Sequence, residues 1–401
     1  RVPSDQEIVE IAQDLLSDRF GGSQHLSEIE PLSGSGSAVV LRAKVAASPF
    51  FQHRSVVLKF IPKTEDPLDD AALLREVAAY QFTNSLSEEA RPGPVLLAHD
   101  IDQRILVLSD SGDGDTFAHL LERDDPEERI QILRNLGTAL GRMHVGTAGK
   151  EDAFYTLSYR ILRNYPEAAT LHAERDELFA RAIDAGLETL QHTGIDTPEL
   201  VRDFASQAEH RLSGGGSRAF TPFDLSPDNI IVADRTQFLD YEWANFHDVS
   251  FDLACVIAGF PQYLSTHPIS DDEAAVFIEA WGAESGETWP NIKNEDLLHT
   301  RILAALVGWA TASVAMMQYG NLGAASEHVS GDEPLPSGSD DLLRPAESGP
   351  FTPEELLARR DLYETFEALA RFARASNDPK DEVTAVWANE VADRVRDRKL
   401  I

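Results

Sequence analysis

The segment that decides the fold of this 401-residue chain reads AFTPFDLSPDNIIV and covers residues 219–232. Asp224 and Asn229 stand five residues apart, directly before an apolar run that its composition predicts to be a strand. A second short strand pattern follows and ends at Asp240, eleven residues after Asn229. Because strands joined by a short connection usually pair, the polar groups at their ends are expected to lie at a fixed separation.

This spacing supplies the groups that phosphoryl transfer needs. One carboxylate must accept or orient the proton of an acceptor hydroxyl, and a second carboxylate with an amide oxygen must hold Mg²⁺ on the phosphates. Asn229 and Asp240 offer the hard oxygen ligands that Mg²⁺ prefers. The alternative is an ordinary hairpin with polar turn residues, but the order of the pieces favours phosphoryl transfer.

A glycine- and serine-rich run upstream fits the same chemistry. It reads LSGSGS over residues 32–37 and precedes a predicted strand. The backbone N–H groups of Gly34, Ser35 and Gly36 are predicted to fold over phosphates. A plain turn is the alternative for this segment.

Lys59 lies inside an apolar strand, where a charged ammonium is unfavourable unless it has partners. A phosphate and a carboxylate would be such partners. Glu76 follows seventeen residues later in a predicted helix and is the expected partner, because such a pair holds the lysine toward the phosphates. Lys44 on the preceding strand is the rival lysine. Both Lys59 and Glu76 would otherwise be solvated surface charges.

The order of predicted elements gives an α+β chain with two lobes. Residues 1–108 carry a helix, short strands and a second helix over 67–86, residues 109–114 are polar and contain glycine, and residues 115–401 are largely helical. We therefore expect a small antiparallel-sheet N-terminal lobe, a hinge at 109–114 and a large helical C-terminal lobe. The strands are expected at residues 39–45, 55–61, 95–98, 105–108, 229–233 and 237–240.

The ordered set resembles the aminoglycoside phosphotransferase and choline kinase family, which shares the fold of protein kinases. The resemblance covers roughly residues 30–260 and rests on Pro222-Phe223-Asp224, Asn229, Leu239-Asp240-Tyr241-Glu242 and Asp252-Leu253-Ala254. It implies that Asp224 is the catalytic base, that Asn229 and Asp240 bind the metal, and that Asp252 supports the catalytic loop. It also implies a two-lobed protein-kinase-like fold with Mg²⁺ and ATP or GTP as cofactors.

The run Leu106–Ser111 resembles the hinge of this family, where backbone groups of Ser109 and Ser111 would meet the purine. Because backbone groups do most of this recognition, ATP and GTP both stay open. His144 matches a histidine common at the end of the helix that follows the hinge. We interpret it as a hydrogen-bonded core residue.

Two residues before the expected base depart from the family pattern. Where the family has His-Gly, this chain has Pro222-Phe223. Proline fixes its own φ and restricts Thr221, so it can stiffen the loop in another way. The departure supports a second hypothesis, a catalytically silent nucleotide-binding regulatory protein. The intact base and metal positions argue against this hypothesis. A kinase for protein side chains is disfavoured, because no Phe-Gly pair or activation loop follows Asp240.

The expected function is a small-molecule kinase that transfers a γ-phosphate to a hydroxyl of a small, amine-bearing acceptor. Glu242 follows Asp240 by two residues, so on an extended segment both side chains point to the same side. With Asp224 they would make a cleft that attracts an ammonium group. The Tyr-Glu pairing resembles choline and ethanolamine kinases, while aminoglycosides and amino-sugars stay open and a neutral sugar is the runner-up. For Glu242 itself, a structural contact with a backbone N–H is the alternative.

Composition limits the partners and the setting. The net charge of −33, from 68 acidic and 35 basic residues, repels nucleic acid and anionic lipid, so neither a nucleic acid nor a membrane is an expected partner. Cys255 is the only cysteine, which excludes a disulfide within the chain and fits a reducing cytoplasm. The most apolar run, residues 302–317, falls short of the roughly 20 residues that span a bilayer and is expected to be a buried helix.

Overall fold

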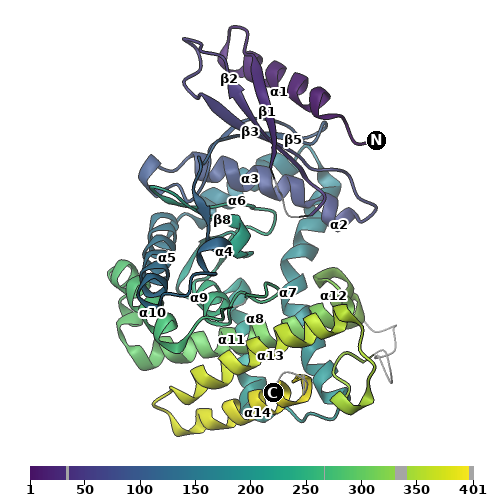
Figure 1. Cartoon of the computed structure of the whole chain (residues 1–401), viewed down its shortest axis with the longest axis vertical. Helices are drawn as coiled ribbons and strands as arrows, with labels where there is room; N and C mark the ends of the chain where they lie inside the picture. Colours follow the sequence, from purple (N-terminus) through teal and green to yellow (C-terminus); the bar gives the residue numbers. More distant parts are fainter. Residues whose placement is uncertain (33–35, 266, 330–340, 397–401) are drawn as a thin grey trace. The chain divides into compact units, whose positions relative to one another are not determined.

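The computed structural model describes residues 1–32, 36–265, 267–329 and 341–396. The chain forms two compact units, and each is built from segments that are distant in the sequence (Figure 1). The first unit comprises Arg1–Phe117, Lys150–Ala173 and Asp228–Asn245. The second unit comprises Ala118–Gly149, Glu174–Pro227 and Phe246–Ile401. The lobe boundaries at residues 108 and 114 stay a prediction.

A five-stranded antiparallel sheet forms the centre of the first unit, in the order β1-β2-β3-β5-β4. Its strands are β1 (Leu26–Leu32), β2 (Val39–Val45), β3 (Ser55–Phe60), β4 (Leu96–Asp100) and β5 (Ile105–Ser109). Burial alternates along β3, so that one face is covered and the other is free for a site. Helix α1 (Asp5–Phe20) joins the core of the sheet through Ile8, Ala12 and Leu16.

Two helices, α2 (Pro67–Asp70) and α3 (Ala72–Asn84), occupy the range predicted as one helix. The break falls at Ala71, whose carbonyl accepts a hydrogen bond from His172 Nε2 at 2.8 Å. Helix α3 is buried almost all round, and Phe82 packs edge-on against Phe154 of α6 (Glu151–Leu162) with ring centroids 5.5 Å apart. This tight packing fixes the helix that carries Glu76.

A second, three-stranded sheet in the first unit has the order β6-β8-β9. Its strands are β6 (Asp115–Thr116), β8 (Ile230–Val232) and β9 (Thr236–Phe238). β8 and β9 form a tight antiparallel hairpin in which Ile230 stands opposite Phe238. The hairpin brings Asn229 beside Leu239, whose N–H donates to the Asn229 carbonyl at 2.8 Å. Asp240 is thereby held next to Asn229.

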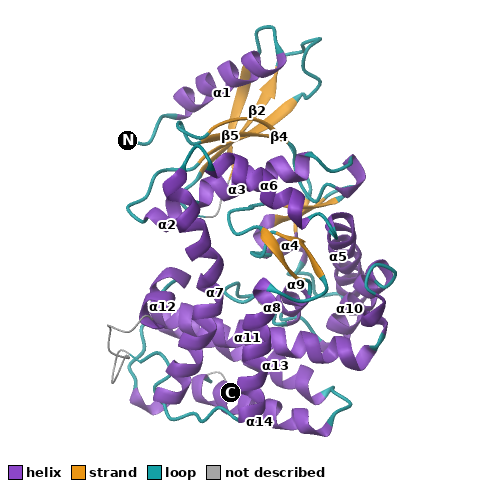
Figure 2. Ribbon diagram, turned by 180° about the vertical axis from the view of Figure 1, so that it is seen from behind, coloured by secondary structure: helices purple, strands orange, loops and turns teal. Residues whose placement is uncertain are grey.

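The second unit is mostly helical (Figure 2). Its helices are α4 (Phe117–Leu120), α5 (Pro126–Thr147), α7 (Pro166–His192), α8 (Glu199–Ser213), α9 (Ser250–Ile257), α10 (Asp271–Ser285), α11 (Glu295–Tyr319), α12 (Leu322–Val329), α13 (Pro353–Arg374) and α14 (Glu382–Val395). Of these, α4 and α7 begin with residues of the first unit. A short two-stranded sheet pairs β7 (Arg218–Thr221) with β10 (Asn245–Asp248). The α+β class expected from the sequence is confirmed.

Helix α11 is the core helix of the second unit. Among the described residues it alone is long and apolar enough to cross a membrane by length and composition, but 83% of its most apolar window is buried inside the protein. The buried helix predicted over residues 302–317 is therefore confirmed. Packing is close where α7 passes α11, because a Cβ added at Gly186 would lie 1.8 Å from the Thr311 carbonyl oxygen. Only glycine fits at this position.

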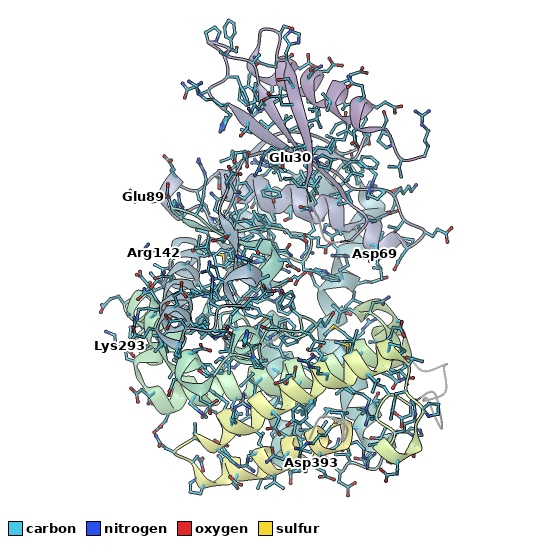
Figure 3. The ribbon with its side chains drawn as sticks, viewed as in Figure 1. Glu30, Asp69, Glu89, Arg142, Lys293 and Asp393 are labelled. Carbon is cyan, nitrogen blue, oxygen red and sulfur yellow. The ribbon has the colours of Figure 1, made fainter. Side chains whose placement is uncertain are left out.

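Charged side chains lie on the surface of both units. The six that Figure 3 labels are all exposed: Glu30, Asp69, Glu89, Arg142, Lys293 and Asp393. Since acidic residues outnumber basic ones by 68 to 35 over the whole chain, the protein carries a strongly negative surface.

Candidate active site

A pocket of about 530 Å³ lies within the first unit. It is lined by strands β2, β3 and β5, by the connector after β5, and by residues between 228 and 240. Val40, Val57 and Leu108 supply apolar wall, while Lys59 and Asp240 supply charge. A mainly apolar cavity of this size with a few converging polar groups is typical of a small-molecule site.

Lys59 and Glu76 form a buried ion pair at this pocket. Lys59 lies two residues after Val57 on β3, so alternation puts both side chains on the pocket face of the sheet. Its ammonium donates to Glu76 Oε1 of α3 at 2.7 Å. The pair expected from the sequence is therefore formed.

The rival Lys44 has a different surrounding. It lies on β2 and pairs with Glu28 of the neighbouring β1 at 2.5 Å. Both side chains are about two-thirds exposed, and Lys44 does not line the pocket. Burial and position thus single out Lys59 among the two candidates.

Asp240 presents an oxygen that no described residue satisfies. Its φ is +66°, in the left-handed region, where aspartate is one of the few residues that occur with moderate frequency. Oδ1 is buried without a hydrogen-bond partner among the described residues, and it lies 3.9 Å from Lys59 Nζ. Oδ2 lies 3.5 Å from the side-chain amide of Asn229. It is the Asn229 Nδ2 group that donates to this oxygen, so the Asn229 side-chain oxygen and the Asp240 carboxylate are the two groups that fit the hard-ligand set of Mg²⁺.

Negative charge exceeds positive charge at this point. Lys59 faces the carboxylates of Glu76, Asp240 and Glu242. Burial opposes the charged ammonium, but Glu76 and Asp240 outweigh it and raise the pKa of Lys59 well above its usual value. Burial raises the pKa of Glu76 despite the nearby lysine, and Asp240 adds to that rise. A divalent cation beside Asp240 would offset this surplus.

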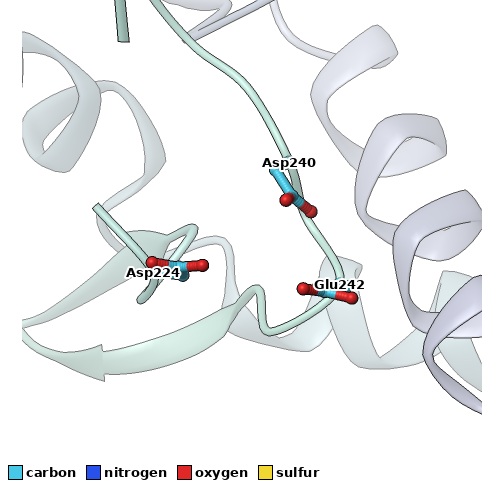
Figure 4. Close-up of side chains that lie close together, drawn as sticks. All are labelled: Asp224, Asp240 and Glu242. Atoms are coloured by element: carbon cyan, nitrogen blue, oxygen red, sulfur yellow. The ribbon is translucent and has the colours of Figure 1, made fainter. Parts of the chain in front are cut away.

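Glu242 lies two residues beyond Asp240 on the same segment. A carboxylate oxygen of Glu242 lies within 4.8 Å of one of Asp240, and Figure 4 shows the two side chains along one stretch of chain. Glu242 is half-buried. The two carboxylates are therefore close, but the φ of +66° at Asp240 shows that the segment is not the extended one expected from the sequence, and a common cleft for both side chains stays a prediction.

The connector after β5 forms another part of the pocket wall. Ser109 and Ser111 both line the pocket. The Ser109 N–H donates to the Val95 carbonyl at 2.9 Å, and the Ser109 hydroxyl accepts from the Val95 N–H at 2.8 Å. The N–H of Ser109 is therefore already used, and a purine would have to meet other backbone groups of the connector.

Sequence reasoning missed an ion pair at this connector. Arg42 of β2 binds both carboxylate oxygens of Asp110, at 2.8 and 3.1 Å, and Asp110 also accepts from the Ser55 hydroxyl at 2.8 Å. Burial would raise the pKa of Asp110, but its bonds with Gly112, Ser55 and Arg42 outweigh that effect and hold the pKa below its usual value. Arg42 lies two residues after the pocket residue Val40 on β2, so both side chains lie on the same face of the sheet, and this spacing was the available signal.

The predicted phosphate loop is only partly described. Gly34 and Ser35 lie outside the described residues. Gly36 has a φ of +76°, and a Cβ added there would meet nothing within 4 Å. Leu32 and Ala38, on either side of the loop, both line the pocket.

Asp224 belongs to the second unit. The Asp224 N–H donates to the Pro222 carbonyl at 2.8 Å, which closes a three-residue turn centred on Phe223, whose φ is +65°. This is the γ-turn with positive φ, a rare and strained form, and such a φ costs on the order of 1–3 kcal/mol for a residue other than glycine. Asp224 Oδ1 accepts from the Ser226 N–H at 3.3 Å.

A buried hydrogen-bond chain supports the start of this loop. Asp252 of α9 accepts from the Thr221 hydroxyl at 2.6 Å and bonds His144 Nε2 at 2.7 Å. Trp281 Nε1 donates to His144 Nδ1 at 2.9 Å. Because an indole N–H only donates, His144 is neutral with its proton on Nε2, directed at Asp252. The interpretation of His144 as a hydrogen-bonded core residue is confirmed.

The family profile described as the phosphotransferase enzyme family matches residues 29–293 of the chain. No curated protein sequence matches significantly. Solved structures with some likeness include an aminoglycoside phosphotransferase in a ternary complex with streptomycin and ATP, at 14% identity and a TM-score of 0.45, which covers 82% of this chain and 97% of that one. Choline kinase from Cryptosporidium parvum Iowa II has 11% identity and a TM-score of 0.45, with 82% and 92% covered. An ADP-bound aminoglycoside phosphotransferase has 14% identity and a TM-score of 0.45, with 92% and 99% covered.

Proposed function

We propose that this chain, which belongs to the phosphotransferase enzyme family, transfers the γ-phosphate of ATP or GTP to a hydroxyl of a small, amine-bearing acceptor. That it is a phosphotransferase acting on an alcohol group follows from the family. The nucleotide, the acceptor and the residue roles are our proposal. The observation that carries it is the pocket of the first unit, where a buried Lys59–Glu76 pair meets an unsatisfied Asp240 oxygen.

On the nucleotide side, the chain holds the phosphates and their metal. Lys59, kept charged by its carboxylate neighbours and oriented by Glu76, binds phosphate oxygens. Asn229 and Asp240 would hold Mg²⁺, which neutralises charge on the phosphates when bound. The apolar wall that includes Val40 and Leu108 takes the base. Backbone groups of Ser109 and Ser111 other than the Ser109 N–H select the purine.

On the acceptor side, Asp224 orients the hydroxyl and accepts its proton. A positioned general base contributes roughly 10²–10⁴-fold to the rate. Asp224→Asn should therefore lower turnover by that factor and leave ATP affinity nearly unchanged, because Asp224 is assigned to the acceptor. The measurement is phosphate transfer from Mg-ATP or Mg-GTP to a panel of amino-alcohols, amino-sugars, aminoglycosides and neutral sugars. Wild-type turnover in the variant would remove Asp224 from this role.

The amine preference rests on the carboxylates that surround Lys59. A carboxylate oxygen of Glu242 lies within 4.8 Å of one of Asp240, and the combined negative charge of the two carboxylates exceeds the single positive charge of Lys59. A cleft with this surplus attracts an ammonium group and repels a carboxylate substrate. Glu242→Gln should raise KM for an amine-bearing acceptor more than for its deaminated analogue. Equal use of both analogues by the wild type, with no change in the variant, would leave a neutral sugar kinase.

The second candidate is a catalytically silent nucleotide-binding regulatory protein. It is favoured by one observation, the strained turn at Phe223 where the family carries glycine. Titration calorimetry that finds Mg-ATP binding without transfer to any acceptor of the panel would select it. In either case the proposed partners are a nucleotide and a small molecule rather than nucleic acid or membrane, given the net charge of −33, and the proposed location is the cytoplasm.

A further inference from the structure

We propose that Phe223 is a positioning residue for Asp224, and that a cluster of aromatic rings in the second unit holds it in place. The inference rests on the proposed function in so far as Asp224 is the base. It goes further by assigning a task to the residue that replaces the glycine of the family pattern.

The backbone at Phe223 needs an external hold. Its φ of +65° lies where residues other than glycine are rarely found, and the bond from the Asp224 N–H to the Pro222 carbonyl closes the turn there. Such a conformation persists only when the surroundings over-determine it. Glycine would adopt it without a side-chain contact, whereas phenylalanine requires one.

Three rings surround the Phe223 side chain, which is only 7% exposed. The ring of Trp309 on α11 stacks on it at 5.3 Å and 24°, and the ring of Phe179 on α7 meets it at a right angle at 5.0 Å. The imidazole of His247 on β10 lies 4.5 Å away. These centroid distances fall in the range of favourable aromatic pairs.

The cluster is itself fixed. Trp309 Nε1 donates to the Phe251 carbonyl at 2.9 Å, and Phe179 also contacts the Trp309 ring edge-on at 4.8 Å. Burial lowers the pKa of His247 to about 4, so its imidazole is neutral near pH 7 and serves as a packing surface. The rings therefore come from three separate elements and leave Phe223 one place to lie.

The turn is held on its other side by Thr221. The Phe223 N–H donates to the Thr221 hydroxyl at 2.9 Å, and that hydroxyl donates to the buried Asp252. The rings hold the side chain of Phe223 and Thr221 holds its N–H, so the direction in which the backbone leaves Phe223 is fixed. The next residue is Asp224, so loss of the ring lets the turn relax to negative φ and rotates the carboxylate.

The test compares Phe223→Leu, Phe223→Gly and Trp309→Leu with the wild type. Leucine keeps the φ restriction and removes the ring, glycine removes both, and the tryptophan change lies outside the loop. Phe366→Leu is the matched control, because Phe366 is fully buried in the same unit and packs edge-on against Trp387 at 5.5 Å. Trp309→Phe keeps a ring and should restore most of the loss seen in Trp309→Leu.

Two readouts are needed. Turnover with Mg-ATP and an accepted substrate should fall on the order of 10- to 100-fold in Phe223→Leu, with KM for ATP within about twofold, because a small misplacement of a catalytic group has that effect. Phe223→Gly should lose less turnover than Phe223→Leu, because glycine adopts this φ without the ring. Hydrogen exchange of the amides of Phe223, Asp224 and Ser226 should quicken by about tenfold or more. The Phe366→Leu control should change neither readout, even if its melting temperature falls.

The outcomes separate the two proposals. Unchanged exchange of the loop amides or wild-type turnover in Phe223→Leu would overturn the positioning role. Absence of phosphate transfer by the wild type would overturn the proposed function, while the exchange comparison would still decide whether Phe223 fixes the loop. Equal losses in Phe366→Leu would reduce the effect to general stability and also overturn the inference.

Discussion

Replacing Glu76 with glutamine should destabilise the first unit far more than the same change at Glu28. Both carboxylates pair with a lysine of one sheet, Glu76 with Lys59 at 2.7 Å and Glu28 with Lys44 at 2.5 Å. Distance alone predicts similar losses, because at an effective dielectric constant of about 20 each pair has about 6 kcal/mol of Coulomb energy before desolvation is counted.

Burial decides between the two pairs. The Lys44 and Glu28 side chains are 68% and 64% exposed, and those of Lys59 and Glu76 are 16% and 2% exposed. An exposed pair contributes about 0–1 kcal/mol, whereas removal of one partner from a buried pair costs about 3–5 kcal/mol. Since burial already raises the pKa of Glu76, loss of its charge offsets part of that cost. We expect about 3 kcal/mol for Glu76→Gln and under about 1 kcal/mol for Glu28→Gln.

Native-state hydrogen exchange of the amides in β3 and α3 measures this loss within the first unit, because both elements flank the ion pair. Glu28→Gln serves as the control in the same sheet. If Glu76→Gln changed the free energy of opening by less than about 1 kcal/mol, or if Glu28→Gln matched it, burial would not be what gives the pair its importance.

Three further experiments test the remaining assignments. Asp240→Ala should abolish the Mg²⁺-dependent part of ATP binding in titration calorimetry, because it removes the anionic ligand; unchanged binding would exclude Asp240. Lys59→Ala should weaken ATP binding by roughly tenfold or more, and Lys44→Ala should not; the reverse result would show that the wrong lysine was chosen. The imidazole of His247 has a pKa near 6.5 in the unfolded chain and about 4 in the folded protein. Its contribution to the free energy of unfolding is therefore complete above about pH 6.5, and between pH 6.5 and 4 it falls by about 1.4 kcal/mol for each pH unit. His247→Phe should flatten this slope in urea unfolding between pH 6.5 and 4.5, and an unchanged slope would assign it to other groups.

Local pattern predicted the parts of the fold that depend on neighbouring residues. Strands β2, β3, β4 and β5 fall within two residues of their predicted ranges, because alternating burial in β2 and β3 and short apolar runs in β4 and β5 leave a trace in the sequence. The Lys59–Glu76 pair was accessible for a related reason, since a charge inside an apolar run needs a partner. Glu76 was identified as the partner because it lies seventeen residues after Lys59 in the next predicted helix.

Contacts between distant, individually ordinary residues left no such trace. The break at Ala71 has no glycine or proline to announce it and depends on His172, about a hundred residues away. In the sequence, Asp110 is an ordinary polar residue of the connector, and only the structure shows that Arg42 binds it. Strand β1, with a φ of +51° at Glu28 and an irregular register, was also missed.

The first unit cannot be completed early during synthesis. Its five-stranded sheet is present once residue 117 has been made, but residues 150–173 and 228–245 belong to the same unit. At about 5–20 residues per second, a ribosome needs roughly 6–25 s more to deliver Asn229 and Asp240. During that interval the nascent chain holds Lys59 and Glu76 without the hairpin that supplies the other wall of the pocket. A fragment that ends at the connector would therefore carry the sheet with Lys59 but lack Asn229 and Asp240.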